Sequence, residues 1–133
     1  IEKKNSMKIT EIFKKKGEKF FRMEEEKEIL KCLKKNNCVI ALGGGAFINK
    51  TIRENILKNA ISIWLDADIK ALNKRVKWSR KRPLLKEENY QKKMYELYTE
   101  RKSIYQLANH KIKCDMLSKK NIAKKITELY EKY

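Results

Sequence analysis

Apolar positions along the chain follow two patterns, which are short continuous runs and longer stretches with helical spacing. Two short apolar runs, "CVIAL" at 38–42 and "ISIWLDA" at 61–67, are typical of buried parallel strands. The segment "HKIKCD" at 110–115 predicts a third strand. Around these runs, apolar residues recur at roughly helical spacing, which predicts amphipathic helices. The predicted helices cover about 9–35, 50–58, 68–77, 89–108 and 119–132.

The order of these elements predicts the fold class. Strands that alternate with helices favour an α/β fold with a parallel sheet, and 133 residues suit a single domain. The helical region 9–35 is expected to begin at Thr10 as N-cap and to break at Gly17. The segment 78–88 contains the only proline and many charges, so it is predicted to be a loop.

Composition limits the classes of function. A formal net charge of +17 is compatible with nucleic-acid binding, but most of the basic residues are lysines spread along the whole chain. Three cysteines without CxxC spacing and one histidine argue against a disulfide framework or a zinc site, and predict buried free thiols. Without a signal peptide or a membrane-length apolar run, we expect a cytoplasmic protein with no membrane partner.

The glycine-rich stretch after residue 42 is similar to a phosphate-binding loop. Gly44 is followed by four residues and then by Asn49, Lys50 and Thr51, whereas the template has glycine before the lysine. In that interpretation the chain is a compact NTPase that uses 44–51, and Asp66 holds magnesium. The alternative is a glycine-rich turn that joins a strand to a helix.

Five ordered motifs point to a specific family. They are "MKITEIFKKKGEKFFRMEE", "VIALGGGA", "IWLDA", "KRPLL" and "YTERKSIY". Together they resemble shikimate kinase, a family of small P-loop kinases related to the nucleoside monophosphate kinases. The resemblance implies a P-loop NTPase-like parallel sheet flanked by helices, in one shikimate kinase-like domain over 1–133 with a lid at about 78–90. It also implies that the first strands and the Walker A loop lie before Ile1, so that this domain is partial.

The same resemblance implies an activity and its partners. The expected reaction is ATP-dependent phosphorylation of shikimate to shikimate 3-phosphate, in the chorismate pathway of aromatic amino-acid biosynthesis. ATP and Mg²⁺ are the implied cofactors, with their main binding elements outside this chain. We therefore expect the isolated chain to be inactive, and to be unstable or to close up differently. We also expect a monomer that binds no nucleic acid.

The resemblance assigns acceptor-binding roles to five residues. Arg22 and Arg101 match the two arginines that grip the shikimate carboxylate, and Glu25 would hold the Arg22 guanidinium. The glycine triplet would bring bare backbone close to the shikimate ring. Its members are Gly43, Gly44 and Gly45.

On the nucleotide side, the resemblance implies two further arginines. Arg82 matches the lid arginine, which would contact ATP and stabilise charge on the transferring phosphoryl group. Arg75 falls where the family has another arginine near the nucleotide. Several other residues are predicted to pack in the core or between helices, namely Tyr95, Tyr98, Tyr105, His110 and Cys114. The compact NTPase and a basic nucleic-acid-binding module remain alternatives.

Overall fold

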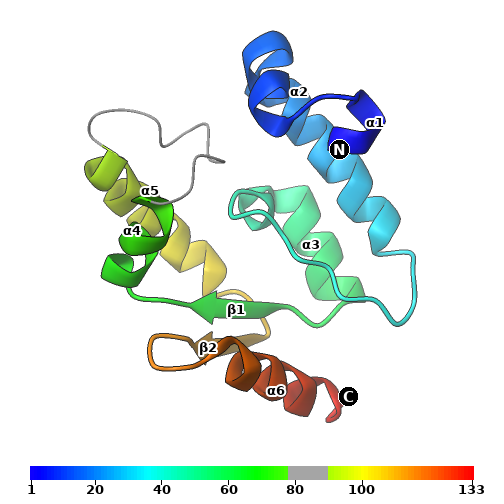
Figure 1. Cartoon of the computed structure of the whole chain (residues 1–133). Coiled ribbons are helices and arrows are strands. Elements are labelled where there is room, and N and C mark those ends of the chain that lie inside the picture. The colour runs from blue at the N-terminus through cyan, green and yellow to red at the C-terminus, as the bar shows by residue number, and fades with distance from the viewer. Residues whose placement is uncertain (78–89) are drawn as a thin grey trace.

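A computed structural model describes residues 1–77 and 90–133 of the chain (Figure 1). Helices predominate, and a short parallel sheet lies among them. In chain order the elements are α1 (Glu2–Asn5), α2 (Ile9–Cys32), the 3₁₀ turn η1 (Ala46–Ile48), α3 (Lys50–Asn59), β1 (Ile63–Asp66), α4 (Ile69–Lys77), α5 (Tyr90–Tyr105), β2 (His110–Lys113) and α6 (Lys119–Tyr130). Among the described helices, none is both long and apolar enough to cross a membrane.

Strands β1 and β2 pair in parallel, with Ile63 opposite His110 and Asp66 opposite Lys113. A polar clasp extends the pairing at its start, because the Ser62 backbone N–H and hydroxyl both donate to the side chain of Asn109, at 3.0 and 2.6 Å. The strands predicted at 61–67 and 110–115 are therefore confirmed, as is a parallel sheet flanked by helices.

The strand predicted at 38–42 is wrong. Those residues belong to no strand or helix, and the side chain of Val39 is 93% exposed. A strand in a parallel sheet is buried only when neighbouring strands and covering helices enclose it. In the described part of the chain, β1 and β2 pair only with each other, and no strand lies beside this run. Apolar composition alone therefore did not make 38–42 a strand.

Helix α2 contains the predicted break. Gly17 has φ of +80° inside the helix, a conformation that residues with a Cβ rarely adopt. The predicted N-cap is wrong, because the helix begins one residue before Thr10, at Ile9, after Lys8. The Lys8 backbone N–H donates to the Glu11 carboxylate at 2.9 Å, so a side chain from the first turn caps this end.

Two apolar clusters hold the helices against one another and against the sheet. One joins α2, η1, α3 and α5, with Ile29, Phe47 and Ile52 buried at its centre. The other joins the sheet to α6 and includes Ile112 and Cys114. The prediction of buried thiols holds for Cys114 alone, since Cys32 is half-buried and Cys38 is exposed in the unpaired run before the glycines.

Candidate functional site

The glycine triplet follows the unpaired run and leads into η1, between α2 and α5. None of its glycines has the positive φ found at Gly17, so backbone conformation does not require them. The close approach of neighbouring side chains is what requires glycine here. A Cβ on Gly43 would lie 3.0 Å from Glu25, one on Gly44 would lie 3.2 Å from Arg101, and one on Gly45 would lie 2.7 Å from Arg22. Each glycine therefore leaves room for a different charged side chain.

Two carboxylates on α2, the helix that carries Arg22, bind its guanidinium from two sides. Nη1 donates to Glu25 at 2.7 Å, while Nε and Nη2 donate to Glu18 at 3.2 and 3.0 Å. The ring of Phe21 lies 5.3 Å below the guanidinium carbon. Burial lowers the pKa of Arg22, but the hydrogen bonds to Glu25 and Glu18 outweigh it and raise the pKa above its ordinary value. The Arg22 guanidinium therefore stays protonated.

Arg101 reaches the same loop from α5. Its Nη1 lies against Gly44, and the hydroxyl of Tyr105, one turn later on the same helix, donates to the Gly44 carbonyl. The Tyr105 ring packs between Phe47 and Trp64, with centroids 6.5 and 6.1 Å away. One face of α5 thus supplies both a cation and a clamp for the loop.

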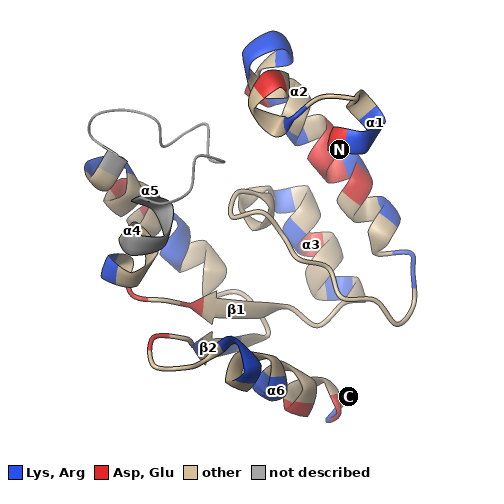
Figure 2. Cartoon of the chain, viewed as in Figure 1, with Lys and Arg blue, Asp and Glu red and all other residues tan. Residues whose placement is uncertain are grey.

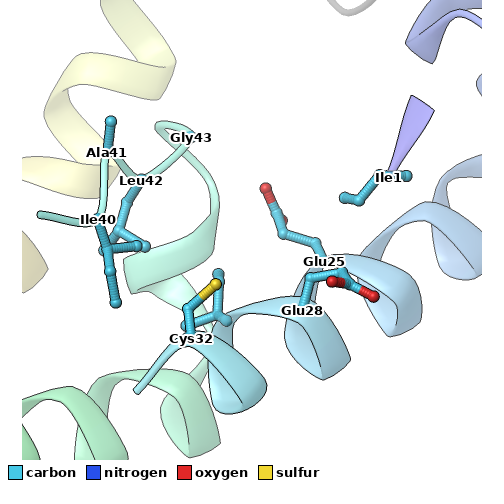
Figure 3. Close-up of a pocket in the computed structure, with 9 residues that line it drawn as sticks. Ile1, Glu25, Glu28, Cys32, Ile40, Ala41, Leu42 and Gly43 are labelled. Atoms are coloured by element: carbon cyan, nitrogen blue, oxygen red, sulfur yellow. The ribbon is translucent and has the colours of Figure 1, made fainter. Parts of the chain in front are cut away.

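A pocket of about 220 Å³ opens beside this loop (Figure 3). Glu25 and Glu28 reach into it from α2, and the segment from Ile40 to Gly43 forms the facing wall. Apart from the two carboxylates, its lining is mainly apolar. Glu25 therefore contacts three features at once: Arg22, the glycine loop and the pocket.

The phosphate-loop interpretation of 44–51 meets a local obstacle. Asn49 has an ordinary extended backbone, and its side chain caps α3 by accepting from the Ile52 N–H at 3.1 Å. The same amide donates to Glu26 at 2.9 Å, which brings a carboxylate to the end of the helix that a phosphate would need. The side chain of Lys50 is 79% exposed and lies 3.8 Å from Glu54. This geometry does not fit a nucleotide phosphate.

The proposed magnesium carboxylate is also engaged elsewhere. Asp66 forms an ion pair with Lys111 on the adjacent strand, with 3.0 Å between Asp66 Oδ2 and Lys111 Nζ. Within residues 1–77 and 90–133, no three His, Cys, Asp or Glu side chains gather in a way that could hold a metal. Neither the loop at 44–51 nor Asp66 therefore fits the phosphates of ATP or the Mg²⁺ that the phosphate-loop interpretation assigns to them.

Among the side chains that the structure describes, the basic ones do not gather on one element. Figure 2 shows Lys and Arg on α1, α2, α3, α5 and α6, interleaved with acidic residues on several of these helices. Arginines 22 and 101 differ from this diffuse lysine population because both lie against the glycine loop.

Comparison with known proteins decides the family. The model for "Shikimate kinase" matches residues 1–131. The chain belongs to the shikimate kinase family. A shikimate kinase from Bartonella henselae is 41% identical over the whole chain, which covers 63% of that relative. One from Sulfurihydrogenibium sp. is 36% identical over 95% of this chain and 75% of its own length. The chain thus spans 63% of the length of the Bartonella relatives that it matches.

Solved structures of shikimate kinases agree with the fold. A shikimate kinase from Acinetobacter baumannii in complex with shikimate has a TM-score of 0.92 and 29% identity, and the match covers 98% of this chain and 74% of that one. The enzyme from Aquifex aeolicus has a TM-score of 0.83 and 30% identity, with coverage of 98% and 76%. The P-loop NTPase-like fold class expected from the sequence is therefore confirmed.

The structure brings together the predicted acceptor-side residues of this shikimate kinase family member. Arg22, Glu25, Arg101 and the glycine triplet meet at one loop. Arg82 and most of the lid at 78–90 lie outside the described residues, and so does the side chain of Arg75.

Sequence reasoning missed two members of this site and misplaced a third residue. The sequence predicts only packing for Tyr105, although its position four residues after Arg101 puts both on one helix face. Glu18 lies four residues before Arg22, so the same spacing could have found it. Tyr95 was also predicted to pack, but it is 63% exposed.

Proposed function

We propose that this chain supplies the acceptor side of an ATP-dependent shikimate kinase, which phosphorylates the 3-hydroxyl of shikimate. The observation that carries the proposal is the meeting of two guanidinium groups at consecutive glycines. Arg101 lies against Gly44, and Arg22 lies against Gly45. Two arginines that converge on one point can hold a carboxylate with both charge and orientation.

The glycine loop adds a second element of recognition. Bare backbone at residues 43–45 allows a ring-shaped ligand to come close, and the apolar pocket beside Gly43 offers a surface for the non-polar parts of a small molecule. The complex of the Acinetobacter baumannii relative with shikimate supports this choice of acceptor. Fixing the acceptor before phosphoryl transfer lowers the entropic part of the barrier.

ATP is the proposed donor, because the family implies its use. We assign nucleotide contacts to Arg82, which would also act in catalysis, and to Arg75, within one domain whose lid covers about 78–90. Magnesium, a cytoplasmic location, a monomeric state and a place in aromatic amino-acid biosynthesis belong to the same proposal. Among the described residues, those that carry the proposal lie on the acceptor side.

Isothermal titration calorimetry with shikimate tests the acceptor site. Arg22→Ala and Arg101→Ala should each weaken binding about 10- to 100-fold, the value of losing hydrogen bonds to a charged group. Lys102→Ala is the matched control, because it removes an exposed neighbouring cation whose contact is with the ring of Tyr98. Circular dichroism spectra verify that each variant is folded. If neither arginine variant weakens binding, the assignment fails.

A further inference from the structure

We propose that Glu18 occupies the carboxylate-binding edge of Arg22 in the ligand-free protein, and that the acceptor's carboxylate must displace it. Glu18 is then an internal competitor that weakens acceptor binding. This inference rests on the proposed function, and it adds a regulatory residue to the same site.

The geometry of the guanidinium points to this competition. Arg22 Nε and Nη2 both donate to a single oxygen of Glu18, at 3.2 and 3.0 Å. These two nitrogens form one of the edges through which arginine binds a carboxylate with two parallel hydrogen bonds. Glu25 engages Nη1 instead. A ligand carboxylate that approaches the Nε–Nη2 edge therefore meets Glu18.

The two carboxylates around Arg22 differ in burial. The side chain of Glu25 is 10% exposed and lies against Gly43, so its position is set by the packed loop. The side chain of Glu18 is 48% exposed. A half-exposed ion pair is stabilised only weakly, because water solvates both charges when they separate. Glu18 can therefore leave Arg22 at small cost, while Glu25 stays to orient the guanidinium.

The break at Gly17 explains why this carboxylate stands there. Gly17 has φ of +80° and interrupts the helix, so Glu18 opens the second helical segment of α2. A carboxylate is favoured at the start of a helix, and it faces a residue four positions later. The local sequence thus places Glu18 beside Arg22 whether or not a ligand is bound.

Calorimetry with shikimate on two variants tests the proposal. Glu18→Gln removes the charge while keeping the shape, and Glu18→Asp keeps the charge but draws the carboxylate back by one methylene. Because an exposed ion pair is weak, each variant should bind shikimate about two- to fivefold more tightly than the wild type. Glu54→Gln is the matched control, since it removes the same charge from an exposed i,i+4 pair on α3 and should leave affinity unchanged.

Three outcomes overturn the proposal. Affinity that is unchanged or weaker in Glu18→Gln means that Glu18 does not compete. Tightening in Glu18→Gln without tightening in Glu18→Asp means that only the long-range field of the charge matters. Tightening that persists when Glu18→Gln is combined with Arg22→Ala means that the effect does not pass through Arg22. The proposed function is tested separately, because it fails when Arg22→Ala and Arg101→Ala alone leave shikimate binding intact.

Discussion

A side-chain carbon on Gly45 would lie 2.7 Å from both terminal nitrogens of Arg22. These residues are joined by contact across the interface between α2 and the loop before η1, and the guanidinium fills the space that a methyl group would need. Because Glu18 and Glu25 hold the guanidinium, it cannot move away without breaking an ion pair.

Gly45→Ala should therefore damage both acceptor binding and folding. The new methyl group would push Arg22 from its place, and shikimate binding should fall at least about tenfold, as for loss of a charged hydrogen bond. Overpacking should cost about 1–3 kcal/mol of unfolding free energy. Titration calorimetry and urea denaturation measure the two effects. Val39→Ala, at a 93% exposed position in the preceding segment, should change neither. Full affinity in Gly45→Ala would show that Arg22 does not bind the acceptor.

Tyr105→Phe tests the hydrogen bond from the Tyr105 hydroxyl to the glycine loop. The ring can still pack against Phe47 and Trp64, but the Gly44 carbonyl loses its hydrogen-bond donor. We expect a loss of about 0.5–1.5 kcal/mol in unfolding free energy. We also expect several-fold weaker shikimate binding, since the loop that faces Arg101 is freed. Urea denaturation and calorimetry check this, and Tyr95→Phe at an exposed position is the control. Equal affinity in both variants would reduce Tyr105 to a packing residue.

Substitutions at the start of α3 separate a helix cap from a phosphate loop. Asn49→Ala removes the side-chain acceptor of the Ile52 N–H and should lower the unfolding free energy by about 0.5–2 kcal/mol. Lys50→Ala should leave stability and any nucleotide binding nearly unchanged, because that side chain is 79% exposed. Chemical denaturation and a fluorescent-nucleotide titration measure these outcomes. Loss of nucleotide binding in Lys50→Ala would instead favour a compact NTPase that uses 44–51.

Acid should weaken the attachment of α1 to α2. Hydrogen bonds from Lys4 and Lys27 hold the pKa of Glu24 below its ordinary value of 4.5. A lowered carboxyl pKa stabilises the folded chain above pH 4.5, and that contribution is lost as the pH falls through the folded-state value. Melting temperatures at stepped pH should fall more steeply below pH 4.5 in the wild type than in Glu24→Gln. Identical slopes would show that Lys4 and Glu24 do not couple the two helices.

Most of the secondary structure followed from local pattern. The helix predicted at 50–58 is found at Lys50–Asn59, and the run at 61–67 contains β1. Helical periodicity depends on side chains three or four residues apart, so neighbours in the sequence determine it. The order of five motifs also sufficed to indicate the family and to single out Arg22 and Arg101, the two arginines that lie against the glycine loop.

Tertiary structure decided what depended on distant partners. The run at 38–42 has a strand's composition but no strand beside it in the described residues, and pairing cannot be known from the run itself. Tyr105 reaches a carbonyl 61 residues away, which no local spacing reveals.

By itself, the sequence determined where the helices and two of the three predicted strands form, which residues carry charge and which family the motifs resemble. Only the tertiary structure decided that Arg22 and Arg101 meet at adjacent glycines, and that Tyr105 reaches the Gly44 carbonyl. The physical reason is range: backbone preference and periodicity act within a few residues, whereas a site is made by packing that joins α2, the glycine loop and α5.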